Sequence, residues 1–239
     1  IVVFSNSLGT DFRIWESCVE NLSNDYSILN YDKRGHGLSG LGNSPYVIDD
    51  HVADLIDLVD HLKISEAVLV GLSVGGLIVQ GVYHKRPDLV QGLILCDTAA
   101  KIGNEQMWND RIAIARDGGL EALLEGNMQR WFSPNFHKNR QVDLRGYEAM
   151  FTRTPLEGYI GTGIAIRDAD FTDKAPSISV PTTCVVGRQD GATPPELVEG
   201  TAKIIPGAKF EIIEEAGHIP CAEQPEKVVS IIREMIVSL

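Results

Sequence analysis

The chain has 239 residues, of which 44% are hydrophobic and 23% are charged, a composition that excludes disordered and fibrous proteins. Its 33 acidic and 21 basic residues give a formal net charge of −12, and an acidic surface repels phosphate groups. We therefore expect no nucleic acid and no membrane as partner. No run of about 18 apolar residues predicts a transmembrane segment either.

The cysteines show neither a C-x-x-C spacing nor a neighbouring group of histidines. They are Cys18, Cys96, Cys184 and Cys221. This pattern predicts no metal site and no disulfide framework, and it favours a reducing, cytoplasmic location. The sequence begins Ile-Val-Val-Phe without a signal peptide or a methionine, so we expect the numbering to start inside a longer protein.

Short apolar runs alternate with helical patterns along the first hundred residues. Strands are predicted at 1–4, 26–31, 67–70 and Val90–Cys96, and helices at 12–22, 47–62 and 74–84. Strands that alternate with helices pair in parallel through right-handed crossovers. The nearly continuous apolar runs at 68–70 and 93–95 predict strands that are buried on both faces of a sheet.

The pattern changes between residues 99 and 176, where helical stretches occur without a convincing strand. The alternation returns with a strand at 182–186, a helix at 195–204, a strand at 209–213 and a helix at 223–239. We therefore expect an α/β core of residues 1–98 and 177–239, interrupted by a helical cap of residues 99–176. The cap is expected over the carboxyl ends of the strands, where open α/β sheets bind ligands.

The sharpest local motif is Gly71-Leu72-Ser73-Val74-Gly75, which has the form G-x-S-x-G between a predicted strand and a predicted helix. A serine on such a strained turn projects its hydroxyl from the sheet, and side chains at the two glycine positions would crowd the turn. We expect Ser73 to be a nucleophile. The alternative is an ordinary glycine-rich turn.

A nucleophilic serine needs a base and an acid that orients the base. His218 follows the last predicted strand and is the first choice for the base, ahead of His36. Asp190, in a glycine-containing loop after the penultimate strand, is the favoured acid, and Asp97 is the second candidate. The other histidines are expected at the surface, at positions 51, 61, 84 and 137.

Acyl transfer also needs hydrogen-bond donors for an oxyanion. The loop after the first strand contains Asn6-Ser7-Leu8-Gly9, and the backbone N–H of Leu8 is our candidate for one donor. The N–H of Val74, at the start of the helix after the serine, is the candidate for the second. Ser7 is expected to orient the site or to contact a substrate. An ordinary polar turn is the alternative for this loop.

With these motifs the chain resembles the α/β-hydrolase superfamily over nearly its whole length. The family sheet starts with about two further strands, which are expected to be missing here, and the cap would follow the sixth family strand. A closer likeness is to 3-oxoadipate enol-lactonases. It rests on the segments 5–11, 71–76 and 97–103 and on Arg130-Trp131-Phe132, with Asn6-Ser7 in place of the superfamily's common His-Gly.

This resemblance implies hydrolysis of 3-oxoadipate enol-lactone to 3-oxoadipate in bacterial degradation of aromatic compounds, with no cofactor and no metal. The substrate carries a carboxylate, so a cationic partner is expected, because a buried unpaired carboxylate is costly. The candidates are Arg111, Arg130, Lys101 and Arg153, with Trp131 as an apolar wall. The alternatives are a general carboxylesterase or perhydrolase-like enzyme and a non-catalytic, ligand-sensing homologue. The oligomeric state stays open.

Overall fold

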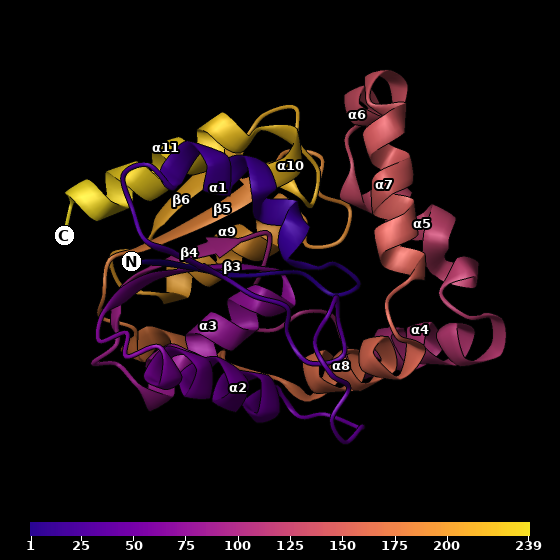
Figure 1. The fold of residues 1–239 in the computed structure, drawn as a ribbon, viewed down its shortest axis with the longest axis horizontal. Coiled ribbons are helices and arrows are strands. Elements are labelled where there is room, and N and C mark those ends of the chain that lie inside the picture. Colours follow the sequence, from indigo (N-terminus) through magenta and orange to yellow (C-terminus); the bar gives the residue numbers. More distant parts are fainter.

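Six parallel strands form one sheet in the order β2-β1-β3-β4-β5-β6, in a computed structural model that describes residues 1–239 (Figure 1). The strands are β1 (Val2–Ser5), β2 (Ile28–Asn30), β3 (Ala67–Leu72), β4 (Val90–Cys96), β5 (Thr182–Gly187) and β6 (Lys209–Ile213). Every residue of β1, β3 and β5 is buried. The apolar runs of the sequence therefore correspond to central strands, as predicted.

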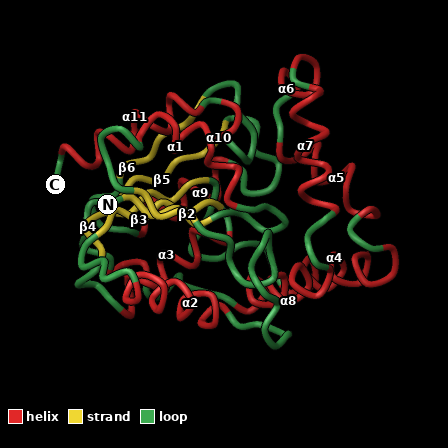
Figure 2. Tube along the Cα trace, viewed as in Figure 1, coloured by secondary structure: helices red, strands yellow, loops and turns green.

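Helices cover both faces of the sheet, which lies between them in Figure 2. One face carries α1 (Glu16–Leu22) and α11 (Pro225–Val237), and the other carries α2 (Ile48–His61), α3 (Val74–Lys85) and α9 (Pro195–Ile204). Leucine, isoleucine and valine side chains from the sheet and the helices merge into one core. Burying each of them contributes roughly 1.5–3 kcal/mol, which stabilises the layered arrangement.

The chain between β4 and β5 is helical and contains no strand, as the sequence predicted. Its helices are α4 (Glu105–Gly118), α5 (Glu121–Trp131), α6 (Pro134–Asn139), α7 (Gln141–Thr152) and α8 (Leu156–Asp168). Helix α4 begins at the N-cap Asn104 and α6 at the N-cap Ser133, whose side chains accept backbone N–H groups. Figure 1 shows this insert beside the sheet, and α8 contacts both α4 and α2.

Two predicted helices differ in detail from the structure. The C-terminal helix expected at 223–239 is divided into α10 (Pro220–Glu223) and α11, because Gln224 leaves the helical conformation before Pro225. A proline disfavours the helical conformation of the residue that precedes it. The helix expected at 12–22 opens as a 3₁₀ turn at Phe12–Trp15, and a second short 3₁₀ turn lies at Ala175–Ser177.

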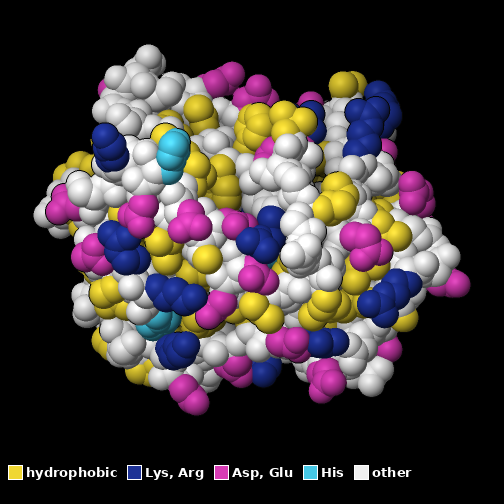
Figure 3. Space-filling model, turned by 60° about the horizontal axis from the view of Figure 1, so that its bottom comes forward, with side chains coloured by type: hydrophobic (Ala, Val, Ile, Leu, Met, Phe, Trp, Pro, Cys, Tyr) yellow, Lys and Arg dark blue, Asp and Glu magenta, His cyan; other side chains and the backbone are white.

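Parallel strands end at the same edge of a sheet, and this arrangement positions the predicted site. Ser73 follows β3, Asp97 follows β4, Asp190 follows β5 and His218 follows β6. Acidic and basic side chains are interspersed over the face of the molecule seen in Figure 3. No helix combines the length and the apolar character needed to cross a membrane.

Candidate active site

Ser73 occupies a sharp turn between β3 and α3, with φ 58° and ψ −117°. Glycines make this turn possible. A Cβ atom at Gly71 would collide with the backbone of Gly75, and one at Gly75 would collide with the carbonyl of Ser5. The hydroxyl of Thr98 donates a 2.6 Å hydrogen bond to the carbonyl of Ser73 and holds the turn against the end of β4. The G-x-S-x-G motif therefore has the strand–turn–helix setting that was predicted for it.

Asp190 and His218 are joined by a 2.9 Å hydrogen bond between Oδ2 and Nδ1, and both residues are buried. Asp190 also accepts bonds from the Thr193 hydroxyl at 2.6 Å and from the backbone N–H groups of Ala192 and Thr193. Burial raises the pKa of Asp190, but the charge of His218 and these hydrogen bonds outweigh it, so its pKa lies below the usual value. An ionised Asp190 accepts the Nδ1–H and leaves Nε2 of His218 free to take a proton.

Asp97, the second acid candidate, lies beside this pair without bonding the histidine. Its Oδ1 accepts the N–H of Gly187 at 2.9 Å, its Oδ2 has no partner, and it lies within 4.8 Å of Asp190 and His218. Burial, together with the charge of Asp190, raises the pKa of Asp97 well above its usual value. Asp97 is therefore the protonated member of the pair, since Asp190 has several donors and Asp97 has one.

These three groups are close enough to share a metal ion, but their hydrogen bonds oppose this use. Each carboxylate oxygen of Asp190 already accepts two hydrogen bonds, which occupy its lone pairs. The protonated Asp97 is a poor ligand, because metals bind the carboxylate form. The donor set fits an acid–base pair better than a metal site.

Ser73 and His218 line the same cavity, of about 250 Å³. Ser7, Leu8, Arg111, Arg130 and Trp131 line it as well, so the predicted site residues other than Val74 and the buried Asp190 converge on its wall. Met107 and Ile114 of α4 also line it and are 42% and 47% exposed, so they border its opening to solvent. A cavity of this size suits a small molecule.

The loop after β1 contributes Ser7 and Leu8 to the wall of this cavity. The N–H of Leu8 forms no hydrogen bond within the protein. Val74 is the first residue of α3, and helix N-termini orient their N–H groups toward anions. The two backbone positions predicted for oxyanion binding therefore lie at Ser73's cavity and at the start of its helix.

Arg111 and Arg130 both donate hydrogen bonds to the side-chain amide of Asn127. Arg111 donates to Asn127 Oδ1 at 2.5 Å and to the hydroxyl of Tyr159 at 2.7 Å, and Arg130 donates to the same Asn127 oxygen at 2.9 Å. Neither arginine forms an ion pair with a carboxylate. Burial, and then the charge of Arg111, lower the pKa of Arg130. Two cations on neutral partners leave positive charge available to an anionic ligand.

The other candidate cations lie elsewhere. Lys101 pairs with Asp170 at the surface at 2.8 Å, and Arg153 lines a separate hollow beside Phe12 and Asp32. Trp131 is 3% exposed, and its ring meets that of Phe151 edge to face, so it is both cavity wall and core of the insert. Of the four candidates for the cation that would pair with a substrate carboxylate, only Arg111 and Arg130 line the cavity.

The structure places two further histidines. His36, the second choice for the base, does not line Ser73's cavity; its Nε2 accepts the N–H of Gly9 at 3.0 Å and its Nδ1 faces the carbonyl of Arg34. Burial lowers its pKa well below the usual value, so it is a neutral, structural histidine. The surface position expected for His51 is wrong, because α8 packs on α2 and the ring lies 3.3 Å from the Thr162 hydroxyl.

Several supporting residues carry no sequence motif. The hydroxyl of Thr193 lies 2.6 Å from Asp190 Oδ2 and 2.8 Å from the carbonyl of Asp97, so these two acceptors share its one hydrogen. The end of α5 holds both loops of the acid–base pair, because the carbonyl of Arg130 accepts Gly191 N–H at 3.1 Å and that of Trp131 accepts His218 N–H at 2.8 Å. The one sequence signal for these contacts is that Arg130 and Trp131 belong to the segment 130–132, which resembles the enol-lactonases.

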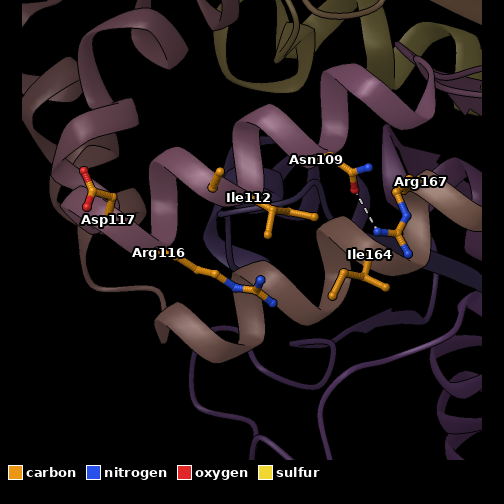
Figure 4. A pocket seen from close by; sticks show the side chains of 7 residues that line it. Asn109, Ile112, Arg116, Asp117, Ile164 and Arg167 are labelled. Atoms are coloured by element: carbon orange, nitrogen blue, oxygen red, sulfur yellow. Dashed lines mark hydrogen bonds between the residues drawn. The ribbon is translucent and has the colours of Figure 1, made fainter.

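A larger hollow, of about 510 Å³, lies between α4 and α8 (Figure 4). Arg167 donates to Asn109 at its rim, and Arg116 and Asp117 lie at its other end. None of Ser73, Asp190 or His218 lines it. The larger hollow is a polar groove at the surface. The smaller cavity, which Ser73 and His218 line, is therefore the candidate active site.

The family model of the alpha/beta hydrolase fold matches residues 1–225. A 3-oxoadipate enol-lactonase of Acinetobacter baylyi is 33% identical over 239 residues, which cover 100% of this chain and 89% of the relative. The solved enol-lactonase from Burkholderia xenovorans LB400 matches with a TM-score of 0.95 and 35% identity, over 99% of this chain and 90% of that one.

A thermophilic esterase from Thermogutta terrifontis, solved with malate bound, matches with a TM-score of 0.94 and 30% identity, over 99% of this chain and 89% of its own. The fold, the serine turn and these similarities agree. The chain therefore belongs to the α/β-hydrolase family.

Proposed function

We propose that this hydrolase opens a small anionic lactone, 3-oxoadipate enol-lactone, with Ser73 as nucleophile, His218 as base and Asp190 as the acid that orients the base. The observation that carries the proposal is the Asp190–His218 hydrogen bond at 2.9 Å beside a cavity that Ser73 shares. The similarity to enol-lactonases over the whole chain supports the hydrolysis of an ester or lactone bond.

In the first step the Ser73 oxygen attacks the lactone carbonyl while Nε2 of His218 takes the hydroxyl proton. Ionised Asp190 stabilises the imidazolium that forms. The N–H groups of Leu8 and Val74 bind the oxyanion of the tetrahedral intermediate. Collapse of the intermediate breaks the bond to the ring oxygen, which leaves as an enol and takes the proton from His218.

In the second step a water molecule loses a proton to His218 and attacks the acyl-serine. The free acid leaves and Ser73 regains its proton. The enol formed in the first step stays on the acyl chain and tautomerises to a ketone, which makes ring opening hard to reverse. No step needs a cofactor.

The substrate carboxylate is assigned to Arg111 and Arg130. A carboxylate in this cavity would meet two guanidinium groups that lack carboxylate partners, and charge-assisted pairing offsets the cost of desolvating it. Trp131 supplies an apolar wall and Ser7 a hydroxyl at the same cavity. Because these arginines belong to the helical insert, we propose that residues 99–176 act as the substrate-selecting cap on a core of 1–98 and 177–239.

The decisive experiment compares the enol-lactone with p-nitrophenyl acetate, a neutral ester, in one absorbance assay. We expect turnover of both and a much higher kcat/KM for the lactone. Turnover of neither substrate would overturn the hydrolase mechanism. Equal kcat/KM values would overturn the lactone assignment and leave the mechanism.

A general carboxylesterase is the second candidate. The similarity to the Thermogutta terrifontis esterase favours it, and the malate bound to that protein is a small dicarboxylate. This candidate shares Ser73, His218 and Asp190. It predicts kcat/KM values that are as high for short neutral esters as for the lactone.

A further inference from the structure

Lys33 is a buried lysine behind the loop that carries Leu8. It lies in the turn after β2 and is 1% exposed. Its ammonium nitrogen donates to the carbonyl of Ser7 at 2.5 Å and lies 3.5 Å from the carbonyl of Thr10. No carboxylate pairs with it within 4.0 Å, so a cation is buried against neutral carbonyl groups alone.

These carbonyls do not need the lysine as a donor. The Ser7 carbonyl also accepts the hydroxyl of Thr10 at 2.9 Å and the Thr10 N–H at 3.4 Å. The Thr10 carbonyl accepts the side-chain amide of Asn6 at 2.5 Å. A neutral side chain of the same length would leave both carbonyls satisfied. Because burying an unpaired ammonium opposes folding, the presence of Lys33 calls for a reason other than stability.

The reason lies in the peptide bond between Ser7 and Leu8. The carbonyl that accepts from Lys33 and the N–H of Leu8, which has no partner in the protein, belong to the same planar peptide group, and Leu8 lines the cavity. The bonds from Thr10 already hold this oxygen in place, so Lys33 adds a positive charge, which polarises the amide and strengthens the N–H as a donor. His36 fixes the next turn of the loop by accepting from Gly9 N–H at 3.0 Å.

We propose that Lys33 is a positioning residue that polarises the Ser7–Leu8 peptide, so that Leu8 N–H binds the oxyanion more strongly. The proposal rests on the proposed hydrolase function. It adds to that function a buried cation that strengthens oxyanion binding. Lys33 would act through the backbone, without touching the substrate.

The protonation of Lys33 makes its effect on the Leu8 N–H depend on pH. Burial lowers the pKa of Lys33 to about 7, against the opposing charges of Asp32 and Asp11. The other titratable groups around it are His36 and His51, and burial lowers the pKa of both, to about 3 for His51, so they stay neutral near pH 7. The charge on Lys33 is present below about pH 7 and is lost as the pH rises through that value.

The test uses Lys33→Met and Lys33→Gln, with Lys227→Met on the exposed face of α11 as the matched control. The assay measures kcat and KM for p-nitrophenyl acetate, together with the temperature of unfolding. Since loss of one oxyanion donor costs ~10²–10³ in rate, we expect weakening of one donor to lower kcat by roughly 10- to 100-fold at pH 6, where Lys33 is charged. KM should change less than about twofold, and the unfolding temperature should stay equal or rise.

A purely structural lysine would give a different result, with activity and unfolding temperature falling together. That outcome, a kcat within about twofold of the wild type, or failure of both variants to fold, would overturn the proposal. The ratio of wild-type to Lys33→Met kcat should also fall as the pH rises from 6 to 9, and a constant ratio would contradict it. A wild-type protein that turns over no ester at all would overturn the hydrolase function itself.

Discussion

The acid–base side of the site and its substrate side are built in different ways. Asp190 and His218 stand at the ends of adjacent parallel strands, β5 and β6, so the topology of the sheet brings them near each other, and backbone bonds to the end of α5 hold their loops. Arg111 and Arg130 lie on helices α4 and α5 of the insert, and their approach depends on how those helices pack around Asn127. In the proposed mechanism, therefore, the chemistry belongs to the ends of the strands and the selection of substrate to the insert.

Removing the nucleophile should have the largest effect and should abolish chemistry for every substrate. We expect Ser73→Ala to lower kcat by at least about 10⁴-fold for both the lactone and the neutral ester. Binding of the lactone, measured by calorimetry, should persist, because the arginines remain. Near-normal turnover by this variant would show that the sheet side does not carry the chemistry.

Replacing the acid should come next and should separate the two carboxylates of the sheet edge. Asp190→Asn keeps the size of the side chain but removes the charge that holds Nδ1–H, and we expect kcat to fall by roughly 10³–10⁴-fold. Asp97→Asn is the matched control, because the protonated Asp97 and an asparagine are both neutral, and its kcat should stay within a few-fold. The reverse ranking would assign the acid to Asp97.

The substrate side should respond selectively. Arg111→Met and Arg130→Met each remove a guanidinium from the cavity, and we expect KM for the enol-lactone to rise by roughly 10- to 100-fold. The kcat/KM for p-nitrophenyl acetate should change little, because that ester has no carboxylate. Lys101→Met, which removes a surface cation paired with Asp170, is the control. Equal losses on both substrates would mean that the arginines only stabilise the insert.

The same contrast explains what the sequence could predict. The succession of strands and helices along the chain, and the positions of Ser73, Asp190 and His218 after strands, followed from apolar runs and from glycine-containing loops. Parallel strands then bring these residues to one edge of the sheet. Four residues were candidates for binding the substrate carboxylate: Arg111, Arg130, Lys101 and Arg153. The choice between them depends on how the helices of the insert pack, which short sequence patterns do not reveal.

Lys33 and His51 mark a second limit of sequence reading. Lys33 stands in a polar turn and His51 on an amphipathic helix, where exposed side chains are expected, yet both are buried. The loop of residues 6–10 covers one and α8 covers the other, and these contacts join segments that lie far apart in the chain.

The smallest effect concerns stability and the proton on Asp97. The pKa of Asp97 is raised in the folded protein, whereas in the unfolded chain it is about 3.9. At a pH between the unfolded and the folded pKa, the native protein therefore holds one more proton than the unfolded chain. The wild-type free energy of unfolding should therefore lose about 1.4 kcal/mol per pH unit through this group as the pH rises from about 4 to the native pKa. Asp97→Asn lacks this proton and keeps the bond from Gly187 N–H, since its side-chain oxygen still accepts.

Urea unfolding of the two proteins between pH 5 and 8 measures this difference. The stability of Asp97→Asn relative to the wild type should increase with pH and level off once the native Asp97 ionises. A difference that does not change with pH would mean that Asp97 is already ionised in the folded protein. The folded pair would then hold no extra proton, and the acid–base side would contain two ionised carboxylates in place of one ionised acid and one neutral neighbour.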